Sequence, residues 1–330
     1  MDANDTRPSD ELASRPRVVV GVDGSAGSRS ALGYAMRAAV QRGADLDVVS
    51  SYAPDLYWMG GAPVAIPDMG SVRDDIEKRV LDMIGDVRSD VEMPPGTDTP
   101  PFRTNLILSP EPPAAELLRR SRDGDLLVVG SRGRGAVRSA LLGSVALHCV
   151  THAPCPVVVV HPTVGEPGGT PRVVVGVDGS DAARAAFAAA IDEAVQRNSE
   201  LDVVATYAVV DYWTDLYSVV IPSVDEIRSD ARRAAEEQVT SVLQERPMGS
   251  AAPVVRIEAV EGAASDVLVE RARGADLLVV GSRGRGAVRA LLLGSVALHC
   301  AMHAPGAVMV VHPQRSGPAK TQEAADHAQP

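Results

Sequence analysis

One passage of this chain occurs twice, almost letter for letter. Residues 126–149 read LLVVGSRGRGAVRSALLGSVALHC, and residues 277–300 read LLVVGSRGRGAVRALLLGSVALHC. The segment RVVVGVDGS also begins at both Arg17 and Arg172, so the chain consists of two copies of one unit. Segments 53–65 and 208–220 share little. If the similarity came only from a recent duplication, the whole unit would be alike. The doubled passage is therefore under a constraint on its sequence that these two segments do not share.

Each unit alternates short apolar runs with helical patterns. In the first unit, strands are expected at 18–22, 46–52, 103–108, 126–129 and 157–160. Helices are expected over 31–39, near 72–91, near 114–122 and from about Ser144. Continuously apolar strands separated by helices predict a parallel sheet that is covered on both faces. The predicted fold class is therefore α/β, with one five-stranded parallel sheet in each unit.

The same patterns set the expected domain boundaries. We expect domain 1 over residues 15–162, a linker rich in Gly and Pro over 163–171, and domain 2 over 172–313. The polar tails 1–14 and 314–330 are expected to be disordered. The last strand of each unit is entirely apolar and would leave an exposed edge unless it is paired.

Composition restricts the function classes. The 330 residues carry a net charge of −11, which opposes a nucleic-acid-binding surface. Three cysteines without a CxxC pair suggest no disulfide framework, and the polar N-terminus lacks a signal peptide's apolar core, so a cytoplasmic location is expected. Residues 290–311 lack Asp, Glu, Lys and Arg, but Gly294, Ser295 and Pro305 predict a buried helix and strand instead of a membrane span.

The doubled passage predicts an anion site. Its strand ends at Val129, so Gly130 lies at the carboxyl edge of the sheet, where open α/β sheets bind ligands. Gly130 and Gly133 lack a Cβ, which lets the backbone approach a ligand and adopt a positive φ if needed. Gly143 and Ser144 stand at a helix start, where free N–H groups favour an anion, and Ser144 can act as N-cap or donate to a phosphate oxygen.

Two donor sets at the ends of one loop suit an extended polyphosphate better than a single carboxylate. Positive charge between the two sets comes from Arg132, Arg134 and Arg138. A glycine turn without a ligand is the alternative, and the exact doubling of the spacing favours the ligand site.

These motifs resemble a known family. The spacing G-x2-G-x9-G-S is met by Gly130, Gly133, Gly143 and Ser144, and again by Gly281, Gly284, Gly294 and Ser295. With the GVDGS turns and the HAPCPVVVV ending of the first half, the chain resembles tandem universal stress proteins of the actinobacterial type, in the ATP-binding branch. The resemblance covers nearly all of residues 15–313. The second half departs from it where Gly306-Ala307 replaces Cys-Pro.

The resemblance implies two tandem Rossmann-like (adenine nucleotide alpha hydrolase-like) domains with helices on both faces of each sheet. It further implies ATP with Mg²⁺ in each domain, pairing of the two domains through their last strands, and a homodimer. The site residues that it implies in domain 1 are Gly21, Asp23, Ala53, Val129, Gly130, Ser131, Arg132, Gly133, Arg134, Gly135, Ala136, Gly143, Ser144 and Val145. Those in domain 2 are Gly176, Asp178, Ala208, Val280, Gly281, Ser282, Arg283, Gly284, Arg285, Gly286, Ala287, Gly294, Ser295 and Val296.

The resemblance also implies roles within this set. Asp23 and Asp178 would position the nucleotide, by accepting from ribose hydroxyls or through a bound metal; the alternative is that Asp23 only caps the next helix. Ala53 and Ala208 would contact adenine through backbone groups. Val145 and Val296 would add backbone donors.

Other candidate chemistry is weaker. His148 and His152 stand four residues apart, as do His299 and His303, but no third ligand is evident and we expect no metal site formed by protein side chains alone. Cys149 and Cys300 beside them are expected to be small core residues, and the aspartates Asp125 and Asp276 are expected to begin strands at the edge away from the site.

No catalytic residue is predicted. The P-loop pattern is absent, Lys78 and Lys320 are the only lysines, and the HIGH and SGGxDS motifs of the related nucleotide enzymes are missing. We therefore expect an ATP-binding sensor or regulator in stress or growth control. The alternatives are a slow ATPase that uses Mg²⁺ with Asp23 or Asp178, and a module that binds cyclic AMP or acts structurally in stress interactions.

Overall fold

A computed structural model describes most of both units. The described residues are 15–52, 69–91, 102–134, 142–162, 170–208, 223–286 and 292–313. The elements of the first half are β1 (Arg17–Gly21), α1 (Ala26–Arg42), β2 (Asp45–Ser51), α2 (Met69–Ser89), β3 (Thr104–Ser109), α3 (Pro113–Arg120), β4 (Leu126–Gly130), α4 (Ser144–His152) and β5 (Val157–Val160). Those of the second half are β6 (Arg172–Val177), α5 (Asp181–Arg197), β7 (Glu200–Tyr207), α6 (Val224–Glu245), β8 (Val255–Glu261), α7 (Ala264–Arg271), β9 (Leu277–Gly281), α8 (Ser295–His303) and β10 (Ala307–Val311).

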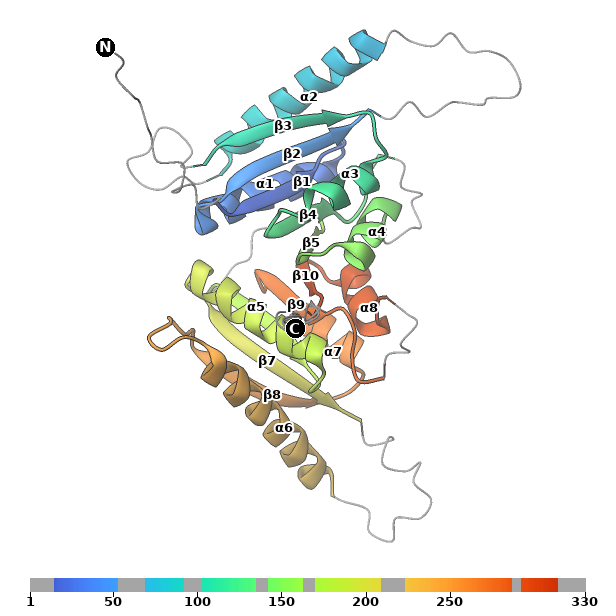
Figure 1. The fold of residues 1–330 in the computed structure, drawn as a ribbon. Coiled ribbons are helices and arrows are strands. Elements are labelled where there is room, and N and C mark those ends of the chain that lie inside the picture. Colours follow the sequence, from blue (N-terminus) through green and yellow to red (C-terminus); the bar gives the residue numbers. More distant parts are fainter. Residues whose placement is uncertain are drawn as a thin grey trace, which may run out of the picture.

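The strands form one continuous sheet. Its order is β3-β2-β1-β4-β5-β10-β9-β6-β7-β8, and the strands within each half are parallel. The halves join where β10 pairs antiparallel with β5, from Ala307 opposite Val160 to Val310 opposite Val157 (Figure 1). The expected α/β class is confirmed, and the expected pairing of the last strands merges two five-stranded sheets into a ten-stranded one.

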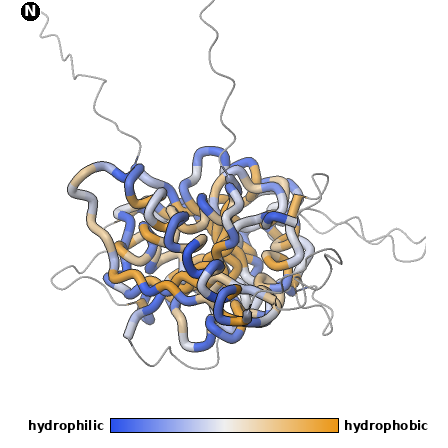
Figure 2. Tube along the Cα trace, turned by 90° about the horizontal axis from the view of Figure 1, so that it is seen from below, coloured by the Kyte–Doolittle hydropathy of each residue, from blue (hydrophilic) through white to orange (hydrophobic). Residues whose placement is uncertain are grey.

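The strands are apolar because both of their faces are buried. Val18 and Val20 belong to the apolar cluster on one face of the sheet and Val19 to the cluster on the other, and all three are fully inaccessible. Helices α1 and α5 contribute to the first cluster, and α4 and α8 to the second. Figure 2 shows the hydrophobic stretches concentrated in the middle of the molecule. Each fully buried valine contributes about 1.5–3 kcal/mol, so this pattern drives sheet formation.

The helices that follow the first strand of each half begin in the same way. The Ser25 hydroxyl accepts from the Ser28 N–H at 3.1 Å and caps α1, and Ser180 caps α5 through the Ala183 N–H at 3.2 Å. Both helices end on a residue with a left-handed backbone: Gly43 closes α1 and Asn198 closes α5. The duplicated caps therefore fix the helix start beside each GVDGS turn.

Asp125 and Asp276 lie just before β4 and β9, at the amino ends of the strands. The carboxylate of Asp125 accepts from the Arg17 N–H at 2.7 Å, and that of Asp276 accepts from the Arg172 N–H at 2.6 Å. Both residues lie at the amino end of the strands, as predicted. None of the helices in the described ranges has the length and apolarity needed to cross a membrane.

A buried ionic group also joins the two halves. Glu193 of α5, with 2 % of its surface exposed, pairs with Arg42 of α1 and with Arg197. Arg197 also donates to the Tyr34 hydroxyl of α1 at 2.6 Å. When Arg17 is aligned with Arg172, Arg42 and Arg197 are equivalent, whereas Glu193 corresponds to Ala38. One carboxylate therefore pairs with two symmetry-related arginines.

We expect Glu193→Ala to lower the free energy of unfolding by about 3–5 kcal/mol, because it leaves two buried guanidinium groups uncompensated. Urea unfolding followed by circular dichroism measures this loss. Arg232→Ala, which removes the exposed α6 pair with Glu236, is the matched control and should cost less than about 1 kcal/mol. A loss for Glu193→Ala no larger than the control's would contradict the prediction.

Candidate functional site

The doubled loops begin at the carboxyl edge of the sheet, against the first helix of each half. A Cβ on Gly130 would lie 2.6 Å from the backbone of Gly27 in α1, and a Cβ on Gly281 would lie 2.6 Å from Ala182 in α5. These two glycines are therefore required for close packing of strand and helix. The sequence analysis allowed a positive φ at Gly130 and Gly133, and neither residue adopts one. Gly24 in the neighbouring GVDGS turn has a positive φ, of 82°.

An aspartate in each GVDGS turn holds the loop to that turn. Asp23 Oδ1 accepts from the Ser25 N–H at 3.0 Å, and its Oδ2 accepts from the Arg134 N–H at 2.9 Å. In the second half Asp178 accepts in the same way from Ser180 at 3.0 Å and from Arg285 at 2.9 Å. The alternative that Asp23 only caps α1 is wrong, because Ser25 is the N-cap and Asp23 joins two loops.

The environment of Asp23 favours its ionised form. Burial acts to raise its pKa, but hydrogen bonds from Ser25, Arg134 and Ser28 outweigh burial, and the pKa is lowered. The carboxylate is thus charged at neutral pH. Its two oxygens accept the backbone N–H groups of Ser25 and Arg134, and the side chains of Ser25 and Ser28 stabilise the same negative charge.

The two ends of each loop meet. The Gly143 N–H donates to the Ser131 carbonyl oxygen at 2.8 Å, and the Gly294 N–H donates to that of Ser282 at 2.7 Å. The two ends of the loop, where one donor set each is predicted, therefore lie side by side at the start of α4 and of α8. Gly143 is the N-cap, so the predicted capping role of Ser144 is wrong, and its hydroxyl stands exposed on the first turn.

In the second half these groups border a cavity of about 800 Å³. The predicted residues that line it are Gly176, Asp178, Ala208, Val280, Gly281, Arg283, Gly284, Arg285, Gly286, Gly294, Ser295 and Val296. Ser282 does not line it, because its side chain is fully buried and only its backbone takes part. Ala53, Gly135, Ala136, Arg138 and Ala287 lie outside the described residues.

Two helices that the sequence analysis did not assign to the site also line this cavity. Asp230, Ala231, Ala234 and Gln238 come from α6, and Leu268 comes from α7. These residues belong to no recognised motif. The only signal in the sequence is the helical spacing of small residues on α6, which is equally typical of helix packing.

The third helix of each half approaches the first strand through its leucine. A Cβ on Gly21 would lie 2.9 Å from Leu117 of α3, and a Cβ on Gly176 would lie 2.7 Å from Leu268 of α7. These glycines thus permit close packing of α3 and α7. Gly130 at the end of β4 and Gly281 at the end of β9 do the same for α1 and α5 on the other face of the sheet. Val129 and Val280 are buried in the strands beside them.

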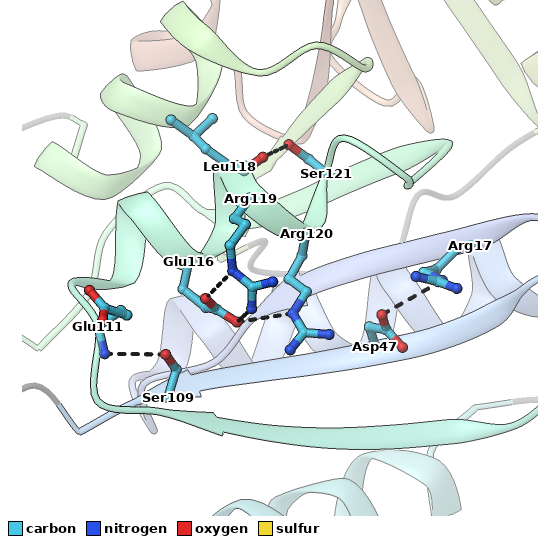
Figure 3. Close-up of polar contacts among 9 residues, drawn as sticks. All are labelled: Arg17, Asp47, Ser109, Glu111, Glu116, Leu118, Arg119, Arg120 and Ser121. Atoms are coloured by element: carbon cyan, nitrogen blue, oxygen red, sulfur yellow. Dashed lines mark hydrogen bonds and ion pairs between the residues drawn. The ribbon is translucent and has the colours of Figure 1, made fainter.

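The side chains around that leucine differ between the halves. The buried Glu116 accepts from Arg119 at 2.6 and 2.9 Å and from Arg120 at 2.9 Å (Figure 3). Burial acts to raise the pKa of Glu116, and the two arginines lower it overall. When the doubled passages are aligned, Glu116 corresponds to Val267 and Arg119 to Glu270. The charges around this leucine therefore differ between the halves.

Each loop is attached to the seam between the halves. The Ser131 N–H donates to the Val160 carbonyl oxygen of β5 at 2.9 Å, and the next residue, His161, contacts the Ala301 carbonyl oxygen of α8 through Nε2 at 2.9 Å. In the second half, Ser282 and His312 make the matching contacts, to Val311 at 2.8 Å and Val150 of α4 at 2.8 Å. Burial first, and then the charges of Arg132 and Arg283, lower the pKa values of His161 and His312.

The other candidate chemistry is structural. No group of three or more His, Cys, Asp or Glu side chains that could hold a metal occurs in the described part of the chain. His152 Nδ1 lies 3.0 Å from the His148 carbonyl oxygen of its own helix. Burial raises the pKa values of Cys149 and Cys300 to about 12, so both thiols stay protonated in the core, as predicted.

Fold and edge geometry together define a tandem Rossmann-like α/β protein, and comparisons with known proteins agree. The profile of the Universal stress protein family matches residues 15–161 and 169–312. A universal stress protein of Mycobacterium tuberculosis is 33 % identical over 308 residues, covering 90 % of this chain and 98 % of the relative. Another, from Mycolicibacterium smegmatis, is 32 % identical over 92 % of this chain and 99 % of its own length.

A crystal structure shows the same fold. A universal stress protein from Archaeoglobus fulgidus superposes with a TM-score of 0.59 at 18 % identity, covering 90 % of this chain and 96 % of that one. The chain belongs to the universal stress protein family.

We expect Asp23→Ala to accelerate hydrogen exchange at the Arg134 amide by about tenfold, because the variant removes a hydrogen bond to a charged acceptor. Exchange read by NMR or by mass spectrometry of overlapping peptides measures it. Asp74→Ala, at an exposed position of α2, is the control. Unchanged exchange at Arg134 would show that the loop is held without the aspartate.

The free energy of unfolding should fall as the pH drops below about 6.5, the ordinary pKa of histidine. The pKa values of His161 and His312 are lowered in the fold, so the unfolded chain takes up protons first; their contribution is complete above that pH and is lost through the folded pKa. Urea unfolding at pH 7.5 and 5.5 measures the change. The double variant His161→Gln, His312→Gln keeps an N–H donor and should weaken the pH dependence; an unaltered dependence would refute this assignment.

Proposed function

We propose that this protein binds ATP in each half and acts as a cytoplasmic, nucleotide-dependent sensor or regulator in stress or growth control. The observation that carries the proposal is the closed loop. In each half, the aspartate of the GVDGS turn accepts from the loop and the N-cap glycine donates to the loop, so the loop backbone lies beside the N-terminus of α4 or α8. Convergent backbone donors at a helix N-terminus suit phosphate.

The remaining features of the second site fit the rest of a nucleotide. Arg283 and Arg285 supply positive charge beside the loop, and the end of β7 at Ala208 offers backbone groups to a base. The cavity of about 800 Å³ falls within the range of roughly 300–1,000 Å³ that is usual for small-molecule sites. The first half repeats the loop, the aspartate and the first arginines, and we propose the same ligand there.

Magnesium fits this arrangement as a companion of the phosphates. Mg²⁺ usually binds through one or two carboxylates together with substrate phosphates and water. Asp178 and Asp230 line the second cavity and are the carboxylates that would hold the ion there. The metal would neutralise phosphate charge, and the chain itself would bind and orient the nucleotide.

Binding without turnover is favoured by the chemistry of the site. Among the described residues, the cavity lining contains neither histidine, lysine nor cysteine. Asp178 already accepts two backbone N–H groups, and Asp230 pairs with Arg233. General-base catalysis needs a group that is free to take a proton. We further propose that residues 15–162 and 172–313 are the two domains and that the chain forms a homodimer.

Gly133→Ala with Gly284→Ala should lower ATP affinity at least tenfold in isothermal titration calorimetry. The added Cβ atoms would lie 2.5 Å from Asp23 Oδ2 and 2.6 Å from Asp178 Oδ2, so the loops must move away from their aspartates. Gly85→Ala, where a Cβ meets no atom within 4 Å, is the matched control and should leave the affinity unchanged.

The proposal fails if the purified protein carries no nucleotide and the double variant binds ATP as the wild type does. Mass spectrometry of the small molecules released by heating tests the first part. Phosphate release that depends on Asp23 and Asp178 would favour an ATPase instead, and a preference for cyclic AMP over ATP would favour a cyclic-nucleotide module.

A further inference from the structure

The wall that α6 contributes to the second cavity contains one amide with a fixed orientation. Gln238 Oε1 accepts from the Gly179 N–H at 2.9 Å. A backbone N–H can only donate, so the amide oxygen must face Gly179 and the NH₂ group must point the other way. The hydrogen bond thus settles which side of Gln238 is available for a ligand.

The Nε2 side of the Gln238 amide, which does not face Gly179, is a buried hydrogen-bond donor. Gln238 lines the cavity, and its Nε2 atom is buried without a hydrogen-bond partner among the described residues. Buried polar groups are paired in the great majority of cases, and an unpaired one calls for an explanation. An acceptor on a ligand in the cavity would provide one.

The first half does not have this donor. When Arg17 is aligned with Arg172, Gln238 corresponds to Met83 of α2. The alignment holds in three dimensions, because Arg29 pairs with Asp86 at 3.3 Å just as its equivalent, Arg184, contacts Ser241 at 3.0 Å.

The residues around these positions differ as well. Met83 packs on the apolar core, whereas Gln238 faces the cavity. One and two turns before these positions, Arg79 and Ile76 of α2 stand where α6 has the cavity-lining Ala234 and Ala231. The second site therefore has smaller side chains on this wall, and it has a neutral amide where the first half has the thioether of Met83.

We propose that Gln238 donates from Nε2 to the nucleoside part of the nucleotide in the second site, and that this site binds the nucleotide more tightly than the first. The inference rests on the proposed function. The neutral amide suits a ring nitrogen or a sugar oxygen, while Arg283 and Arg285 already provide charged donors for the phosphates. Gln238 is then a residue that determines specificity, outside the loop motif.

The test uses the full chain with Gly133→Ala, which leaves the second site as the one with an intact loop. In this background, Gln238→Met introduces the residue of the first half, and Gln238→Glu keeps an acceptor for the Gly179 N–H while removing the donor. Calorimetric titration with adenosine, which carries no charge, avoids repulsion between the new carboxylate and phosphate. Both variants should bind adenosine about five- to tenfold more weakly, the effect of one hydrogen bond.

Two controls separate a ligand contact from a structural role. Gln244→Met, on an exposed position of the same helix, should change nothing. The melting temperature of Gln238→Glu without ligand should match that of the background, because the bond to Gly179 is retained. Titration with inorganic tripolyphosphate should give the same affinity for Gln238→Met, which adds no charge, as for the background.

The outcomes are distinct. If the chain binds ATP but the Gln238 variants bind adenosine as the background does, the inference is wrong and the proposed function stands. Weakened tripolyphosphate binding by Gln238→Met would overturn the assignment to the nucleoside. If neither site of the wild-type chain binds ATP, the proposed function itself fails.

Discussion

The antiparallel ladder between β5 and β10 is the contact on which the rest of the molecule depends. Without this ladder, β5 (VVVV) and β10 (AVMVV) would both be exposed edge strands. Exposed apolar edges favour aggregation. The same two strands also hold both loops. The Ser131 N–H donates to the Val160 carbonyl oxygen at the end of β5, and the Ser282 N–H donates to that of Val311 at the end of β10. It also carries His161 and His312 across the seam, so the sites and the seam share one set of backbone contacts.

Backbone contacts also build each site. An aspartate joins the first turn to the loop, a glycine N–H closes the loop on itself, and a glycine without Cβ lets the strand reach the first helix. The side chains that accomplish this are small or act on main-chain atoms. Replacing any of them changes the position of several N–H donors at once, which explains why the passage is nearly identical in both copies while neighbouring segments differ.

The molecule is symmetric in its backbone and asymmetric in its side chains. Glu193 has no counterpart because Ala38 stands in its place, and one carboxylate serves both arginines of the seam. Glu116 faces two arginines in the first half, where Val267 stands in the second. Gln238 likewise corresponds to Met83, so two nearly identical loops stand in different surroundings in the two halves.

The sequence by itself determined the α/β class, the strand positions within a few residues, and the duplication, because continuous apolar runs and repeated turn motifs are local signals. It also placed Gly130, Asp23 and their equivalents at the carboxyl edge. Tertiary structure alone decided the closure of the loop by Gly143, the double contact of Asp23, and the wall formed by α6. These contacts join residues that are distant along the chain, and their donors are mostly backbone N–H groups, which every residue except proline carries and which therefore leave no mark in the sequence.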